Sequence, residues 1–155
     1  MTPKQLFRLA AIAEAITWTL LITALILRAS TGFALGVTIA GGIHGFVFLA
    51  YGATAILMAI NQRWHPGVAI TAIASAVIPY ATIPAEIWLA RTGRLEGAWR
   101  RDETDDPRDR SWIDRLARWF IRHPLLFLLV IAAAVVVLFV VLLTVGPPEL
   151  PGSDD

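Results

Sequence analysis

The feature of this sequence that most constrains its fold is a set of four apolar runs, each long enough to cross a membrane. The runs cover residues 6–27, 36–60, 67–90 and 125–145. At a rise of 1.5 Å per residue, a helix of about 20 apolar residues crosses a hydrocarbon core of about 30 Å. None of the runs alternates with a period of two, which argues against strands. We therefore predict an all-α fold, a transmembrane helix bundle.

The composition agrees with this prediction and excludes several function classes. Hydrophobic residues make up 57% of the chain and charged residues 16%, so an ordinary soluble domain and a disordered chain are both poor alternatives. There is no cysteine, which excludes disulfides, thiolate nucleophiles and cysteine-ligated zinc. The common signatures of hydrolases, metalloproteases and nucleotide-binding enzymes are also absent. We expect a protein that is not an enzyme and that has no cofactor and no metal site.

A charged linker over residues 91–123 separates the third and fourth runs, with nine arginines and seven acidic residues. Because the acids are interleaved with the arginines, the linker does not resemble a nucleic-acid-binding segment. An amphipathic helix is predicted within it, preceded by Ser111 as N-cap. We expect its apolar face to lie in the membrane interface, the alternative being a soluble helix packed on its own bundle. The residues of this face are Trp112, Leu116, Trp119 and Phe120.

These features divide the chain into four parts. We predict a three-helix membrane domain at 1–97, the charged linker with its amphipathic helix at 98–123, a fourth transmembrane helix at 124–146 and a disordered acidic tail at 147–155. The fourth run has no ionisable residue, so we expect the domain at 1–97 to fold without it. Pro79 and Pro84 are expected to kink the third helix as a packing device, not to create a broken-helix binding site.

The basic residues predict how the chain is oriented in the cell membrane. Four crossings would place the N-terminus, the second loop and the C-terminal tail on one side of the bilayer, and the first loop and the linker on the other. The second of these sides carries ten lysines and arginines and the first carries three. Because basic residues concentrate in cytoplasmic loops, we expect a cytoplasmic linker with both termini outside. The first run is expected to remain as an uncleaved helix and not to act as a secretory signal.

Three ionisable side chains, Glu14, His44 and Glu86, lie inside the predicted spans. Each would be costly against lipid, so each should face the bundle interior or a water-filled cavity. Helix rise separates neighbours in this series by about 6 Å along the membrane normal, so the three could form a polar chain. The alternative is structural pairing that fixes helix register. Next to His44, Gly41 and Gly45 form a small-xxx-small pair that would let another helix approach closely.

Several segments of the chain together resemble a known family of small bacterial membrane proteins. They are residues 7–14, residues 42–51 with their His44-Gly45 pair, residues 79–82 and residues 86–89. This pattern resembles the family classed as domain of unknown function 3817, over about residues 7–94. The resemblance implies a three-helix membrane domain with polar residues at Glu14, His44 and Glu86 and with no assigned activity. The linker and the fourth run would be additions to that domain.

Two functions stay open on these grounds. The first is a non-enzymatic accessory or assembly protein, in contact with the lipid bilayer, that binds other membrane proteins or a second copy of itself through small-residue faces. The alternative is a small proton-relay or transport unit that uses Glu14, His44 and Glu86. At 16.9 kDa the chain is small for an alternating-access transporter, so the alternative would require an oligomer or a partner.

Overall fold

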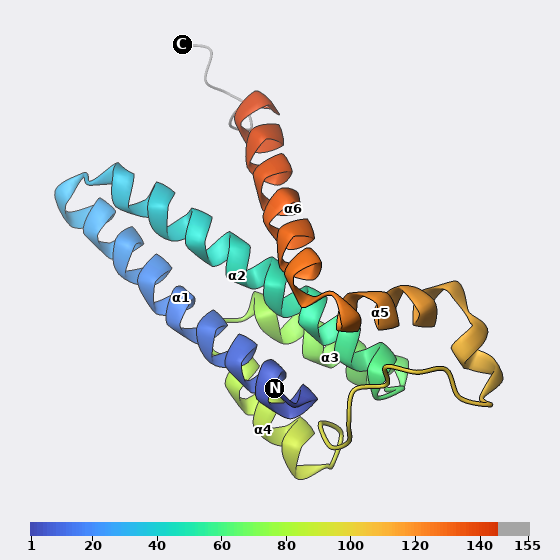
Figure 1. Cartoon of the computed structure of the whole chain (residues 1–155). Coiled ribbons are helices and arrows are strands. Elements are labelled where there is room, and N and C mark those ends of the chain that lie inside the picture. The colour runs from blue at the N-terminus through green and yellow to red at the C-terminus, as the bar shows by residue number, and fades with distance from the viewer. Residues whose placement is uncertain (146–155) are drawn as a thin grey trace.

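The frame of the molecule is a pair of long antiparallel helices, α1 (Pro3–Thr31) and α2 (Ala34–Asn61) (Figure 1). The computed structural model describes residues 1–145, which form eight helical segments and no strand. Thr2 and Gln5 form a capping box at the start of α1. At its end Gly32 adopts φ +75° and donates its N–H to the Arg28 carbonyl, a left-handed conformation that favours glycine. The all-α prediction is confirmed.

Two helices, α1 and α2, are long and apolar enough to cross a membrane. A third candidate arises if α5 (Trp112–Arg122) and the first part of α6 (Pro124–Val145), which meet at a bend of 105°, are counted as one span. By length and composition, residues 1–145 therefore contain two or three helical segments that could span a membrane.

The third predicted span is not one helix. It is divided into α3 (Pro66–Ala74), the short 3-10 helix η1 (Ser75–Val77) and α4 (Thr82–Arg91). Ile78 is extended because it precedes Pro79, and a residue before proline is disfavoured in the helical region. Tyr80 then has φ +65°, which turns the chain sharply. The single helix expected at 67–90, kinked at its prolines, is therefore wrong.

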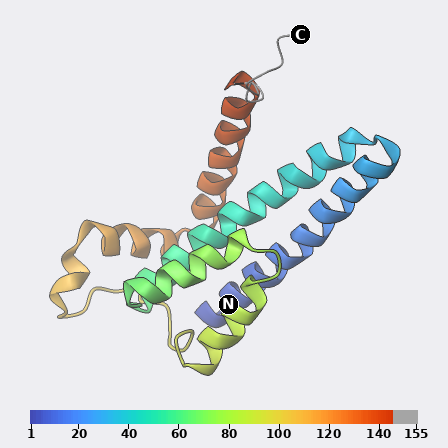
Figure 2. The same ribbon diagram turned by 180° about the vertical axis from the view of Figure 1, so that it is seen from behind.

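The segment from Pro66 to Arg91, here called the α3–α4 hairpin, begins and ends at the same end of the bundle. The Trp64 indole, just before α3, donates to the Arg94 carbonyl, just after α4, at 2.8 Å. Figures 1 and 2 show that α3 and α4 cover the half of the α1–α2 pair that lies nearest the N-terminus. The other half of the pair extends beyond the turn of the hairpin.

The hydrophobic core lies where the hairpin meets the two long helices. Its largest members are Phe7, Tyr51, Met58, Leu89 and Leu95, all fully buried. The Phe7 ring lies 5.4 Å from that of Tyr51 and 5.9 Å from that of Trp64, in a tilted and an edge-to-face arrangement. Such geometry suits aromatic quadrupoles. The core therefore joins all three predicted helices of the membrane domain.

The linker after the hairpin contains the short 3-10 helix η2 (Pro107–Arg110) and the predicted amphipathic helix, α5. Ser111 caps α5 by accepting a hydrogen bond from the Asp114 N–H at 3.1 Å, as its position predicts. The final helix, α6, packs near its start against α2 and then leans away from the bundle (Figure 1). The tail predicted at 147–155 lies outside the described residues.

The N-terminus and the linker lie together, which corrects the expected topology. The Trp99 indole donates to the Met1 carbonyl at 3.0 Å, and Arg63 in the second loop pairs with Asp106 and Asp109 of the linker. Groups in hydrogen-bond contact cannot be on opposite sides of a core about 30 Å thick. The expectation that the linker faces away from the N-terminus and the second loop is wrong, because the third apolar run turns back on itself.

Candidate functional site

Glu14 and His44 meet in the interior, between α1 and α2. The Glu14 side chain is fully buried, and its Oε1 lies 4.0 Å from Nδ1 of His44. Neither carboxylate oxygen of Glu14 has a hydrogen-bond partner in the described part of the chain. Buried polar groups are nearly always hydrogen-bonded, so this carboxyl group is an exception that requires an explanation.

Thr17 connects the two side chains, and the direction of its hydroxyl hydrogen is coupled to the tautomer of the imidazole. Its Oγ1 lies 3.0 Å from the Glu14 backbone carbonyl and 3.1 Å from Nδ1 of His44. A hydroxyl has one proton, so if it donates to the carbonyl, its oxygen must accept from Nδ1. Nδ1 of His44 then carries a hydrogen and faces Glu14.

Trp18 joins this pair to the break in the α3–α4 hairpin. Its ring centroid lies 4.5 Å from that of His44, and its indole N–H donates to the Ala76 carbonyl at 3.3 Å. Ala76 belongs to η1, where the helical hydrogen-bond ladder is interrupted. Trp18 of α1 therefore satisfies a backbone carbonyl of the hairpin.

Tyr51 and Ser75 satisfy the second carbonyl at the break. The Ala72 carbonyl accepts from the Ser75 hydroxyl at 2.7 Å and from the Tyr51 hydroxyl at 3.0 Å, and these two hydroxyls are 2.9 Å apart. Irregular backbone at membrane depth requires such partners from neighbouring helices. The two long helices thus supply both the partners for the broken backbone and the Glu14–His44 pair beside it.

Glu86, the third predicted member of the cluster, is not brought into contact with the other two. It is buried on α4, yet within residues 1–145 no hydrogen bond or ion pair links it to another group. Thr82, one turn earlier, donates to the Ala11 carbonyl at 3.1 Å and packs α4 onto α1. The structure therefore joins two of the three predicted residues. No group of three His, Asp or Glu side chains in the described chain is arranged to hold a metal ion.

The predicted packing and interface residues lie at the surface. A Cβ atom placed on Gly41 or Gly45 would meet nothing within 4 Å, so both positions leave room for another helix to approach. On α5, Trp112, Leu116 and Trp119 are 68%, 45% and 43% exposed. The fourth member of that face, Phe120, is half-buried with its ring 5.3 Å from Phe127 of α6. The contact of this face with lipid stays a prediction.

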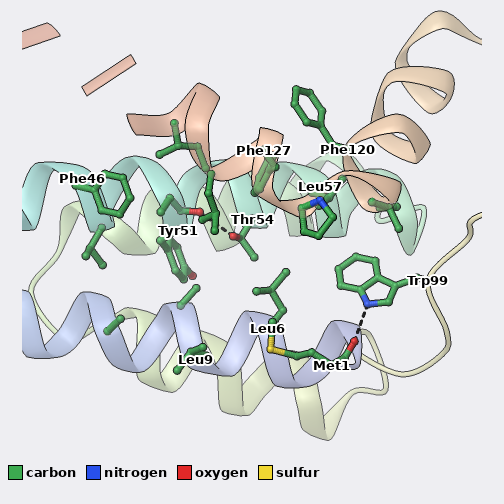
Figure 3. A pocket seen from close by; sticks show the side chains of 18 of the residues that line it. Met1, Leu6, Leu9, Phe46, Tyr51, Thr54, Leu57, Trp99, Phe120 and Phe127 are labelled. Atoms are coloured by element: carbon green, nitrogen blue, oxygen red, sulfur yellow. Dashed lines mark hydrogen bonds between the residues drawn. The ribbon is translucent and has the colours of Figure 1, made fainter. Parts of the chain in front are cut away.

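An apolar cavity that the sequence did not indicate lies between α1, α2 and the junction of α5 with α6. Its volume is about 510 Å³. Figure 3 shows the α1 side chains on one wall, the α2 side chains behind them and the two phenylalanines of α5 and α6 opposite. Representative lining residues are Leu6, Leu9, Phe46, Leu57, Phe120 and Phe127. The cavity separates α6 from α1, so α6 depends on α2 for its packing.

The linker contains a further buried carboxylate, Asp109, which the sequence analysis did not single out. Asp109 accepts hydrogen bonds from Arg63 at 2.7 Å, from Arg100 at 2.8 Å and from the backbone and hydroxyl of Thr104 at 2.8 and 2.6 Å. The Thr104 hydrogen bonds, with the charges of Arg100 and Arg63, hold the pKa of Asp109 below its usual value. The interleaved charges of this segment indicated ion pairs, but not which acid is central.

Arg100 extends this cluster to the end of α2. Its Nε donates to the Asn61 carbonyl at 2.7 Å and its Nη2 to the Ile60 carbonyl at 2.5 Å. The last carbonyls of a helix lack partners within the helix, so a guanidinium there both caps it and interacts favourably with the helix dipole. The linker is thereby attached to the second loop. We call Arg63, Arg100, Thr104, Asp106 and Asp109 the linker cluster.

The family match to known proteins covers nearly the same residues as the predicted membrane domain. "Putative membrane protein SCO5905" of Streptomyces coelicolor is 42% identical to this chain over 91 residues, which are 57% of the chain and 11% of that protein. The chain therefore matches about a tenth of the length of this relative. No solved structure matches. The family described as "Domain of unknown function (DUF3817)" matches residues 4–91, which end with α4. A match over more than half of its length shows that the chain belongs to the DUF3817 family.

Proposed function

We propose that this protein is a non-enzymatic accessory protein of the cell membrane, which packs against a helix of another membrane protein. The observation that carries the proposal is the uncovered Gly41–Gly45 face of α2. An added Cβ atom at either glycine would meet nothing within 4 Å, so another helix has room to approach there. Small residues at this spacing let two helix backbones approach closely, which is a main source of association in lipid.

The surroundings of this face support the same proposal. Leu49, one turn after Gly45 on the same side of α2, is half-buried, so an apolar side chain is available to pack beside a partner helix. The Streptomyces coelicolor relative contains the matching 91 residues as a small part of a much longer membrane protein. A unit that can be joined to a larger membrane protein in one species is well suited to bind such a protein as a separate chain.

The test is the mass of the native complex after solubilisation from its own host membrane in mild detergent. We expect a defined complex with a second membrane protein that Gly41→Leu or Gly45→Leu dissociates. Gly42→Leu is the matched control, because Gly42 is adjacent on α2, has equally open space and points to another face. A monomer, or a homo-oligomer that both sets of variants leave intact, would refute the accessory role.

We also propose a specific topology, which replaces the expected one. The N-terminus, the second loop, both ends of the hairpin and the linker lie on the cytoplasmic side, and the hairpin is re-entrant. Twelve of the thirteen lysines and arginines then lie on that side, with Arg28 alone at the turn between α1 and α2. This asymmetry favours the cytoplasmic assignment strongly. α6 crosses the bilayer and ends outside.

Labelling of single cysteines in intact cells tests the topology, and the absence of native cysteines gives a clean background. A cysteine at Ser30, in the turn between α1 and α2, should react with a membrane-impermeant thiol reagent. Cysteines at His65 and Asp105, both exposed, should react only after the membrane is permeabilised. Labelling of Asp105→Cys but not of His65→Cys in intact cells would show that the hairpin crosses the membrane and that the proposal is wrong.

A further inference from the structure

Glu14 is the one fully buried carboxylate of the membrane domain, and both of its oxygens are enclosed. Its side chain has no exposed surface, and both of its oxygens lack a hydrogen-bond partner among the described residues. The break in the hairpin does not need it, because Trp18, Tyr51 and Ser75 already satisfy the freed carbonyls. A charged carboxylate in this position would be stabilised only by a cation held close to it.

The space around Glu14 restricts what that cation can be. Both oxygens have almost no solvent-accessible surface, so an ammonium group, which is about as large as a water molecule, has no room beside the carboxylate. A proton needs no room of its own. We propose that Glu14 and His44 together form an intramembrane protonation site, which holds one exchangeable proton on either the carboxyl group or the imidazole.

The two states of the site differ by a single proton transfer. In one state Glu14 is a neutral carboxylic acid and His44 a neutral imidazole with its hydrogen on Nε2, so that Nδ1 is a free acceptor and the Thr17 hydroxyl is turned to donate to it. In the other, the carboxyl proton has moved to the imidazole, which leaves a carboxylate next to an imidazolium. The Nδ1 to Oε1 distance of 4.0 Å exceeds a hydrogen bond, and a rotation of either side chain that shortens it to about 2.8 Å allows the transfer.

His44 is the residue through which a proton reaches the site. Its side chain is 11% exposed, whereas that of Glu14 is 0% exposed. Nδ1 faces Thr17 and Glu14, while Nε2 bonds to no residue of the described chain. Imidazole can accept a proton on one ring nitrogen and release one from the other, so a proton taken up at Nε2 is matched by one passed from Nδ1 to Glu14.

The neighbouring elements supply few other groups that titrate. α2 contributes Tyr51 and α4 contributes Glu86, while α3 and η1 contribute none. The ring of Trp18, 4.5 Å from the imidazole, is placed to stabilise a positive charge there. Because the Trp18 indole also bonds to Ala76, the protonation state of His44 is coupled to the break in the hairpin. This site goes beyond the accessory role and does not depend on a partner.

Infrared spectroscopy of the full chain in lipid vesicles, as a function of pH, tests the proposal. The carbonyl stretch of a protonated carboxylic acid is distinct from the bands of a carboxylate. We expect a titrating carboxylic-acid band that Glu14→Gln abolishes and that the matched variant Glu86→Gln, in another buried carboxyl, leaves in place. In the wild-type protein, nitrogen-15 NMR of histidine should show a transition of His44 at the same pH as that band.

Coupling between the two groups distinguishes a shared proton from two independent residues. Groups that share a proton titrate as a pair, so Glu14→Gln should shift the His44 transition by about one pH unit or more. If Glu14→Gln does not fold, Glu14→Asp, which keeps the acid but lengthens the gap, should shift the infrared band instead. A histidine transition that neither variant moves, or a wild-type protein with no titrating band, would overturn the proposal and leave a purely structural pair.

Discussion

Two carboxylates within residues 1–145 are fully buried, and their surroundings differ in opposite ways. Asp109, in the linker, accepts hydrogen bonds from two arginines and from Thr104. Glu14, in the membrane domain, accepts none, and its nearest cationic group is an imidazole at 4.0 Å. Each acid has a tryptophan within four positions of the sequence, Trp18 for Glu14 and Trp112 for Asp109. A nearby aromatic residue therefore does not account for the difference in hydrogen bonding.

The difference lies in the donors that each environment can supply. The linker cluster is at the end of the bundle, where its arginines keep 23% of their side-chain surface in contact with solvent while reaching a buried acid. Within the hydrocarbon core such a group is costly, and the residues around Glu14 are small, apolar or already bonded. A fully paired acid has one stable charge state and fixes structure. An unpaired acid beside a histidine can change its charge state.

The largest effect is expected from reversing the charge of the unpaired acid. Glu14→Lys places an ammonium group in a closed apolar site beside His44, with no anion to pair with it. A lysine at the centre of a membrane helix costs about 3 kcal/mol, and little folded protein should remain. Glu14→Gln keeps the shape without the charge and should change stability by about 1 kcal/mol or less.

Size-exclusion chromatography and thermal unfolding in mild detergent measure both variants. Ile16→Lys, on the exposed face of α1 two residues away, is the matched control for adding a lysine to this helix. If Glu14→Lys folds as well as Ile16→Lys, the Glu14 site is more open than the structure indicates.

The second effect comes from removing the paired acid. Asp109→Ala leaves Arg63, Arg100 and the Thr104 donors without their common acceptor, and loss of one member of a buried charged cluster is strongly destabilising. We expect amide exchange in residues 104–118 to rise by at least tenfold, while α1 and α2 stay protected. Asp105→Ala is the control, because Asp105 is exposed and makes no ion pair with the described residues. Equal exchange in both variants would mean that the cluster does not hold the linker.

A third, smaller effect is expected when the linker and α6 are removed together. Truncation after Gly97 takes away the paired acid and the Arg100 cap of α2, but none of the residues of the core around Phe7 and Tyr51 except Trp99 at its edge. We expect a membrane-inserted protein with helicity per residue like that of the full chain and a loss of about 2 kcal/mol from the missing hydrogen bonds. Degradation or aggregation in mild detergent would show that α6 belongs to the core.

The sequence indicated the parts of this fold that depend on hydropathy and local signals. The apolar runs predicted α1 and α2, and the arrangement of Ser111 and Asp114 predicted the start of α5. The free-energy cost of an ionisable side chain against lipid drew attention to Glu14 and His44. Hydropathy could not show that the third run turns back, because a hairpin buried against other helices is as apolar as a span. Pro79 marked the place, yet the turn also requires Tyr80 at φ +65° and side-chain partners from α1 and α2.

The error in topology followed from that one segment. Counting the third run as a crossing placed the linker opposite the N-terminus and divided the basic residues ten to three. With the hairpin returning to the same end, twelve basic residues gather there. The linker cluster was beyond prediction for a different reason. Its central contact joins Arg63 to Asp109, residues 46 positions apart, and among seven acids nothing local distinguishes the buried one.

The smallest effect is expected from pH, and it separates the two acids most directly. Hydrogen bonds from Arg108 lower the pKa of Asp106, and those from Thr104 lower the pKa of Asp109. A lowered folded-state pKa stabilises the docked linker fully above the unfolded value of about 4, and this stability is lost as the pH falls below it. Between pH 8 and pH 5, amide exchange of residues 104–118, corrected for its intrinsic pH dependence, should therefore stay constant. A loss of protection within that range would show that a group other than Asp106 and Asp109 controls docking, and the contrast between a fixed and an exchangeable acid would fail on the linker side.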